Sequence, residues 1–163
     1  MSIGEKYVKN KLFTSGNIGS MVLKNRIIMT AVHLGYSLER EKAFFARRAK
    51  GGAAAVTSVW GVNPVGTSGN MHLICLENKE SLTCLAKDIQ IKGSKLIVQL
   101  FHAGRNGNTG RLYDKKLCPV SPSNVPSPIY KETPRVMSIE EIRETVIDFG
   151  KAAKLCKDSG VDA

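Results

Sequence analysis

The stretch that most constrains the fold is residues 95–105, which read KLIVQLFHAGR. Its apolar run lies between a Gly-Ser pair and a glycine-rich segment, a pattern typical of a buried strand. Gln99 lies inside the run, and His102 and Arg105 follow it. A buried amide needs a hydrogen-bond partner, and polar groups at the carboxyl end of a parallel strand often form a ligand site. The alternative is a plain strand followed by a polar loop.

Strand and helix patterns alternate before this stretch. Residues 27–29 and 53–59 are predicted as short buried strands, with a helix over residues 39–50 between them. A second amphipathic helix is predicted over residues 79–92, with Asn78 as its N-cap. Because no tight hairpin separates these strands, the order predicts parallel βαβ units in an α/β fold.

The segments on either side of this alternation also carry signals. Apolar residues around a Gly-Ser pair predict a hairpin over residues 17–23. Residues 101–137 are irregular and rich in proline, and a loop of this length inside a compact domain is normally functional. A capping box, Ser138 with Glu141, predicts a helix that begins there and stops near residue 159. Residues 161–163 are where the next strand is expected to begin.

Composition and charge limit the functional classes. The chain has 163 residues, 42% of them hydrophobic, and a net charge of +10. The basic residues are scattered without interleaved aromatics, so we expect no nucleic-acid partner. No apolar run approaches the length of a membrane helix or a signal peptide, so we expect no membrane partner and a cytoplasmic location.

Cysteine and histidine spacing gives no sign of a metal site. None of the four cysteines forms a C-x-x-C pair, and the three histidines lie far apart. We therefore predict free thiols and no metal ligands.

Residues 98–105 resemble the Q-L-x-H-x-G-R signature of the Old Yellow Enzyme family of NADH:flavin oxidoreductases. The segments 12–27, 30–36 and 137–153 resemble other parts of this family in the same order. The His-x-Gly at residues 33–35 looks like the branch that includes 2,4-dienoyl-CoA reductase. The resemblance covers residues 11–163.

The resemblance implies a fold. The chain is expected to be the N-terminal part of a (β/α)8 TIM barrel, with an N-terminal β-hairpin that covers the bottom of the barrel. Residues 1–163 would form the N-terminal portion of one FMN-binding domain, truncated at the start of the fourth barrel strand. The reason is that three strands cannot close a barrel that needs about eight.

The same resemblance implies an FMN-dependent oxidoreductase. Hydride would pass from NAD(P)H through the flavin to an activated C=C bond of a small electron-poor alkene or CoA ester. In relatives the proton donor lies beyond the position of Ala163, as does any iron–sulfur cluster, so the fragment is expected to be inactive alone. Oligomerisation is left open.

The resemblance also assigns roles to individual positions. His33 would face the reactive side of the flavin and stabilise negative charge on the reduced ring, although it could also be an ordinary loop histidine. His102 and Arg105 would border the substrate or hold the loop. The expected cofactor-binding residues are Thr30, Ala31, Val32, Ser58 and Gln99.

Two departures and two rival functions accompany this interpretation. Trp60 stands where relatives tend to have small residues, which leaves the pocket shape open, and it could equally be a packing residue. Cys118 departs from the family pattern in the proline-rich loop. The rivals are another phosphate-ligand TIM-barrel enzyme, such as an aldolase or a synthase, and a basic binding module.

Overall fold

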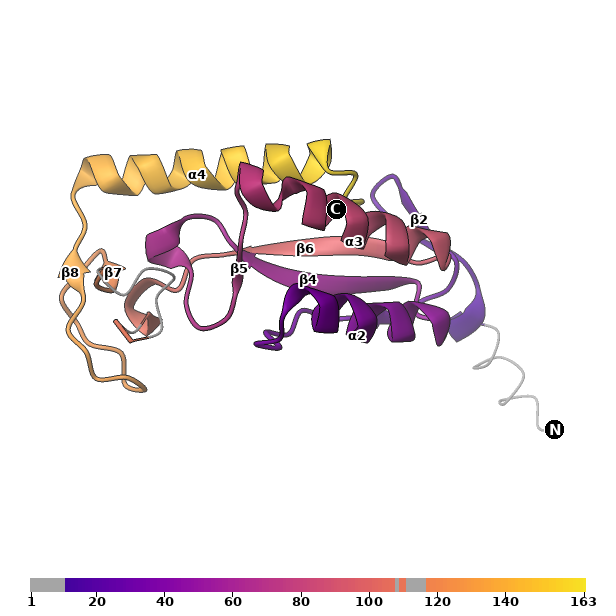
Figure 1. The fold of residues 1–163 in the computed structure, drawn as a ribbon, viewed down its shortest axis with the longest axis horizontal. Helices are drawn as coiled ribbons and strands as arrows, with labels where there is room; N and C mark the ends of the chain where they lie inside the picture. Colours follow the sequence, from indigo (N-terminus) through magenta and orange to yellow (C-terminus); the bar gives the residue numbers. More distant parts are fainter. Residues whose placement is uncertain (1–10, 108, 111–116) are drawn as a thin grey trace.

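A parallel sheet forms the centre of the molecule. The computed structural model describes residues 11–107, 109–110 and 117–163. In the sheet, β4 (Ala55–Gly61) lies between β3 (Ile28–Met29) and β6 (Lys95–Phe101), and it pairs with β6 along its whole length (Figure 1). The short strand β5 (His72–Leu73) pairs with the last two residues of β4. All these pairings are parallel, which confirms the predicted βαβ order.

Three helices pack on one face of the sheet: α2 (Leu38–Lys50), α3 (Lys79–Ile91) and α4 (Ile139–Asp158). Each helix turns an apolar stripe toward the strands, because apolar side chains recur at the helical period. The main core joins these stripes to alternate residues of β4 and β6; its largest members are Phe45, Val56, Trp60, Leu82, Ile89 and Leu96. The helix-facing side of the sheet therefore carries the main hydrophobic core.

The predicted hairpin is present as β1 (Gly16–Ile18) and β2 (Met21–Leu23), which pair antiparallel. Leu23 packs with Ala54, Ala55 and Ile97, which lie toward the amino ends of the strands. The hairpin therefore closes the amino end of the sheet and leaves the carboxyl end to the loops.

Several element boundaries differ from the sequence prediction. β4 begins two residues later than predicted and runs on through Trp60 and Gly61, because β5 and β6 both pair with these two residues. A short 3₁₀ helix, η2 (Leu76–Asn78), precedes α3. Asn78 precedes α3 as predicted, but its side chain does not cap the helix; its amide donates to the Leu73 carbonyl at 2.9 Å.

The long loop after β6 contains structure that the sequence did not predict. It holds η3 (Gly104–Asn106) and a two-residue parallel ladder between β7 (Val120–Ser121) and β8 (Arg135–Val136). This ladder leads directly into α4.

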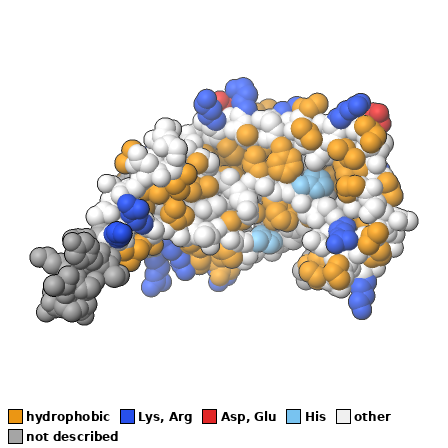
Figure 2. Space-filling view, turned by 180° about the vertical axis from the view of Figure 1, so that it is seen from behind, with side chains coloured by type: hydrophobic (Ala, Val, Ile, Leu, Met, Phe, Trp, Pro, Cys, Tyr) orange, Lys and Arg blue, Asp and Glu red, His pale blue; other side chains and the backbone are white. Residues whose placement is uncertain are grey.

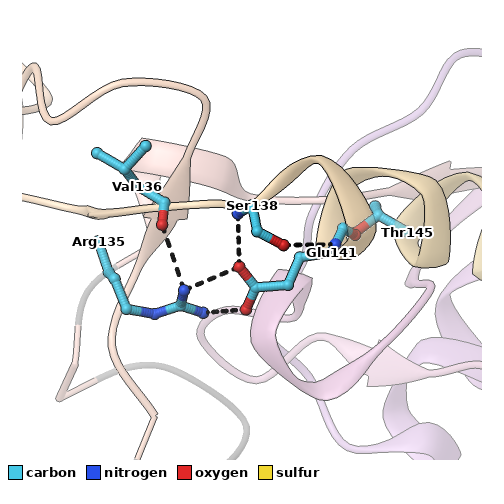
Figure 3. A network of polar contacts seen from close by, with 5 residues as sticks. All are labelled: Arg135, Val136, Ser138, Glu141 and Thr145. Atoms are coloured by element: carbon cyan, nitrogen blue, oxygen red, sulfur yellow. Dashed lines mark hydrogen bonds and ion pairs between the residues drawn. The ribbon is translucent and has the colours of Figure 1, made fainter.

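The predicted capping box begins α4 (Figure 3). The Glu141 backbone N–H donates to Ser138 Oγ at 3.2 Å, and the Glu141 carboxylate accepts from the Ser138 backbone N–H at 2.8 Å. The same carboxylate accepts a fork of two hydrogen bonds from Arg135, at 2.6 and 2.9 Å. Glu141 therefore joins the end of the loop to the start of the helix.

Residues 161–163 run alongside β6. The Val98 N–H donates to the Ala163 carbonyl at 2.8 Å, and the Asp162 N–H donates to the Leu96 carbonyl at 3.0 Å. These residues form no strand of their own, so the further strand expected on this edge of β6 stays a prediction. Among the described residues, no helix is long and apolar enough to cross a bilayer.

Candidate active site

The strand register decides which side chains meet at the carboxyl end of the sheet. Val59 is paired with Gln99, and Ser58 with Val98. Because side chains alternate along a strand, Val59 and Gln99 share the face away from the helices. Ser58 and Trp60 share the other face.

Gln99 is exposed, which corrects the expectation of a buried amide. The reason is its face: Gln99 lies on the side of the sheet that no described helix covers, while its neighbours Val98 and Leu100 pack against the helices. Its amide, with donor and acceptor on one group, is thus presented at the carboxyl end of β6. Val59, its register partner, was missed by the sequence reasoning, and only the strand register identifies it.

Ser58 belongs to a buried network on the helix side. Its hydroxyl donates to Glu41 Oε1 at 2.5 Å and accepts from Trp60 Nε1 at 2.9 Å. The second carboxylate oxygen of Glu41 lies 2.6 Å from His72 Nε2. The Ser58 hydroxyl is thus engaged with the helix layer, and its assignment to the cofactor stays a prediction.

Trp60 is fully buried in this layer. Its ring centroid lies 5.1 Å from that of His72, so it packs in the core on the helix side of the sheet, away from the face that carries Gln99. No sequence signal pointed to Glu41 or His72, because α2 and β5 bring them together from distant positions.

The segment after β3 presents most of the other predicted cofactor residues. Thr30, Val32 and His33 are exposed and Ala31 is half-buried. Figure 2 shows the side of the molecule that faces away in Figure 1: hydrophobic side chains run along its middle with histidines among them, while lysines and arginines stand mainly at its margins. The site is therefore open and largely apolar.

The loop over residues 62–71, which follows β4, is anchored at its base. Thr67 is fully buried, and its hydroxyl donates to the Asn63 carbonyl at 2.6 Å. A Cβ on Gly61 would lie only 1.8 Å from Thr67 Oγ1, so this close approach requires glycine. The Asn63 amide in turn donates to Asp148 of α4 at 2.9 Å.

His102 joins this loop to the one that follows β6. A Cβ on Gly66 would lie 2.3 Å from His102 Cδ2, and the Ala103 N–H donates to the Gly66 carbonyl at 2.7 Å. Burial lowers the pKa of His102, which favours the neutral ring, and Nδ1 accepts from the Gly104 N–H at 3.1 Å. His102 thus holds two loops together. Arg105 is exposed in η3.

All four cysteines are free thiols, as predicted. Within the described ranges, no group of three or more His, Cys, Asp or Glu side chains could hold a metal ion. The site thus offers amide, imidazole, hydroxyl and backbone groups on an apolar surface.

Comparison with known proteins agrees with this geometry. The sequence model of the NADH:flavin oxidoreductase / NADH oxidase family matches residues 11–163. A protein named metal reductase from Desulforamulus reducens is 36% identical over 158 residues, covering 93% of this chain and 23% of its own length. An NADPH dehydrogenase from Bacillus subtilis is 32% identical over 163 residues, covering 93% of this chain and 46% of its own.

The fold matches a solved structure of an old yellow enzyme homologue from Zymomonas mobilis. The TM-score is 0.81 at 22% identity, and the match covers 94% of this chain and 47% of that one. The expectation of a partial TIM barrel with an N-terminal hairpin is confirmed. The chain spans about half the length of this homologue and of the NADPH dehydrogenase.

Proposed function

Because the chain belongs to the NADH:flavin oxidoreductase / NADH oxidase family, we propose that it forms the flavin-binding first part of an FMN-dependent reductase. When bound there, FMN would supply the hydride-transfer chemistry that links NAD(P)H to an electron-poor C=C bond. The proton that completes the addition at the α-carbon would come from an acid outside this chain. The aldolase, synthase and basic-module alternatives are set aside by the family assignment.

The observation that carries the proposal is the placement of Gln99 beside Val59. Both lie on the face of the sheet away from the helices, at the carboxyl ends of adjacent parallel strands, where TIM barrels bind ligands. Gln99 is exposed there, and Val59 beside it is buried. An exposed amide could give a donor and an acceptor to the pyrimidine edge of a flavin. This donor set fits a flavin.

The segment after β3 would complete the cradle. Residues 30–32 would contact the flavin through backbone and small side chains. His33 would hold a hydrogen-bond donor near the negative charge of the reduced ring. Neither role requires a metal ligand.

The test compares variants of the full-length protein that carries this chain. Gln99→Ala is expected to weaken FMN binding by about 5-fold or more, since a lost hydrogen bond that leaves its partner unsatisfied costs about 1–3 kcal/mol. Gln99→Glu keeps the shape but loses the donor, so it should weaken binding as well. His33→Ala should retain FMN but slow flavin reduction by NADPH. Wild-type FMN affinity in both Gln99 variants would contradict the placement.

Reduction of a metal ion is a second candidate. It is favoured by the 36% identity to a protein named metal reductase. In that case the substrate would be an oxidised metal ion, and bound FMN would supply the electron-transfer chemistry. The two candidate functions are distinguished by measuring, on one preparation, the NADPH-dependent reduction of 2-cyclohexen-1-one and that of ferric citrate. The dienoyl-CoA branch and a CoA ester substrate stay within the first proposal and would be tested by adding an enoyl-CoA to the same assay.

A further inference from the structure

The tip of the loop over residues 62–71 contacts the segment that carries His33. A Cβ on Gly69 would lie 3.1 Å from His33 Cε1 and 3.8 Å from its Nε2. One residue on, the Asn70 amide donates to the Gly35 carbonyl at 3.3 Å. The loop therefore meets this segment at two points.

The same loop is fixed at its base. Thr67 is packed on Gly61, and Gly66 is packed on His102 with a backbone hydrogen bond to Ala103. Beyond the tip, β5 returns the chain to the edge of β4. Because packed elements resist small displacements, a loop that is anchored at both ends holds its tip in a defined position.

Glycine at position 69 suits this arrangement for two reasons. Its φ of +69° lies in the left-handed region, which side chains rarely adopt. An added methyl would also stand closer to the imidazole than the roughly 3.5–4.0 Å of an ordinary carbon contact. A larger residue at position 69 would therefore strain the loop backbone and displace the His33 side chain.

We infer that the loop over residues 62–71 is a positioning arm for His33, with Gly69 and Asn70 as the residues that set where the imidazole lies. The inference rests on the proposed function only for its catalytic consequence, since the contact itself is a property of the chain. In the flavin-loaded enzyme the arm would fix the distance between His33 and the flavin.

The test uses the full-length protein with 13C-labelled histidine Cε1, in which the His33 NMR signal is identified by its loss in His33→Ala. Gly69→Ala should shift the His33 signal. Gly19→Ala is the matched control, since Gly19 also has a positive φ, +56°, but nothing lies within 4 Å of its Cβ position. The control should leave the signal in place.

The catalytic readout is the rate of flavin reduction by NADPH. A misplacement of about 1 Å can cost on the order of 100-fold in rate, so Gly69→Ala should lower this rate by about 10-fold or more while FMN affinity is kept. Asn70→Ala, at an exposed position, removes the polar contact without backbone strain and should also shift the His33 signal.

The outcomes are distinct. An unmoved His33 signal in both Gly69→Ala and Asn70→Ala would overturn the inference. A shifted signal in a protein that binds no FMN would support the arm and contradict the proposed function.

Discussion

The packing of Gly61 against Thr67 gives a prediction whose size can be worked out from the structure. A Cβ on Gly61 would lie 1.8 Å from Thr67 Oγ1, 2.7 Å from Cβ and 2.9 Å from Cγ2. Thr67 is fully buried and holds a hydrogen bond to Asn63, so it cannot rotate away freely. Gly61→Ala should therefore destabilise the protein by about 1–3 kcal/mol, the usual range for overpacking.

The reciprocal change removes the obstacle. Thr67→Gly deletes the side chain that a residue 61 methyl would strike. It costs about 0.8 kcal/mol for the buried methyl, about 0.5–1.5 kcal/mol for the hydrogen bond, and about 0.5–1 kcal/mol for glycine flexibility. In the double variant the new methyl at position 61 occupies the vacated space. We therefore expect the double variant to lose about 1–2 kcal/mol less unfolding free energy than the sum of the losses in the two single variants.

The assay is urea denaturation of the full-length protein, followed by far-UV ellipticity, for the wild type, both single variants and the double variant. Gly150→Ala is the control, because its Cβ position is open and it lies inside α4; it should stabilise by about 0.5–1 kcal/mol. Single effects that add to within about 0.5 kcal/mol in the double variant would refute the packing argument.

Two further predictions concern ionisation. Hydrogen bonds from the Arg135 guanidinium and, to a lesser extent, from the Ser138 N–H lower the pKa of the Glu141 carboxyl to about 2. A carboxyl whose pKa is lower in the folded state stabilises the folded protein at pH values above its unfolded-state pKa, and this stabilisation is lost as the pH falls toward 2. Replacing Glu141 with Gln should therefore flatten the fall in stability between about pH 4.5 and 2, as measured by thermal melts; an unchanged slope would argue against the ion pair. Burial raises the pKa of Cys156 to about 11, whereas Cys84 and Cys118 are exposed. A thiol-reactive disulfide at pH 8 should label those two first and Cys156 only after denaturation, and early labelling of Cys156 in peptide mass spectra would contradict its burial.

The elements that could be predicted from sequence were those with a local cause. The capping box of Ser138 and Glu141 and the Gly-Ser turn of the hairpin are signals within a few residues, and both are present. The apolar stripes of the helices follow from their spacing, and the parallel order follows from the alternation of elements.

What could not be predicted depends on contacts between distant residues. β5 and the β7–β8 ladder are two residues long and have no pattern of their own. Ser58 and Val59 are neighbours in sequence, and only the register with β6 shows which of them lies on the face of Gln99. The network of Glu41 with Ser58 and His72 arises from three separate elements.

The most direct test of the central claim is the identity of the cofactor in the full-length protein that carries this chain. We expect a yellow protein with flavin absorption bands that releases FMN, and not FAD, on denaturation, in a ratio near one per chain. A colourless protein that takes up no FMN on reconstitution would contradict it.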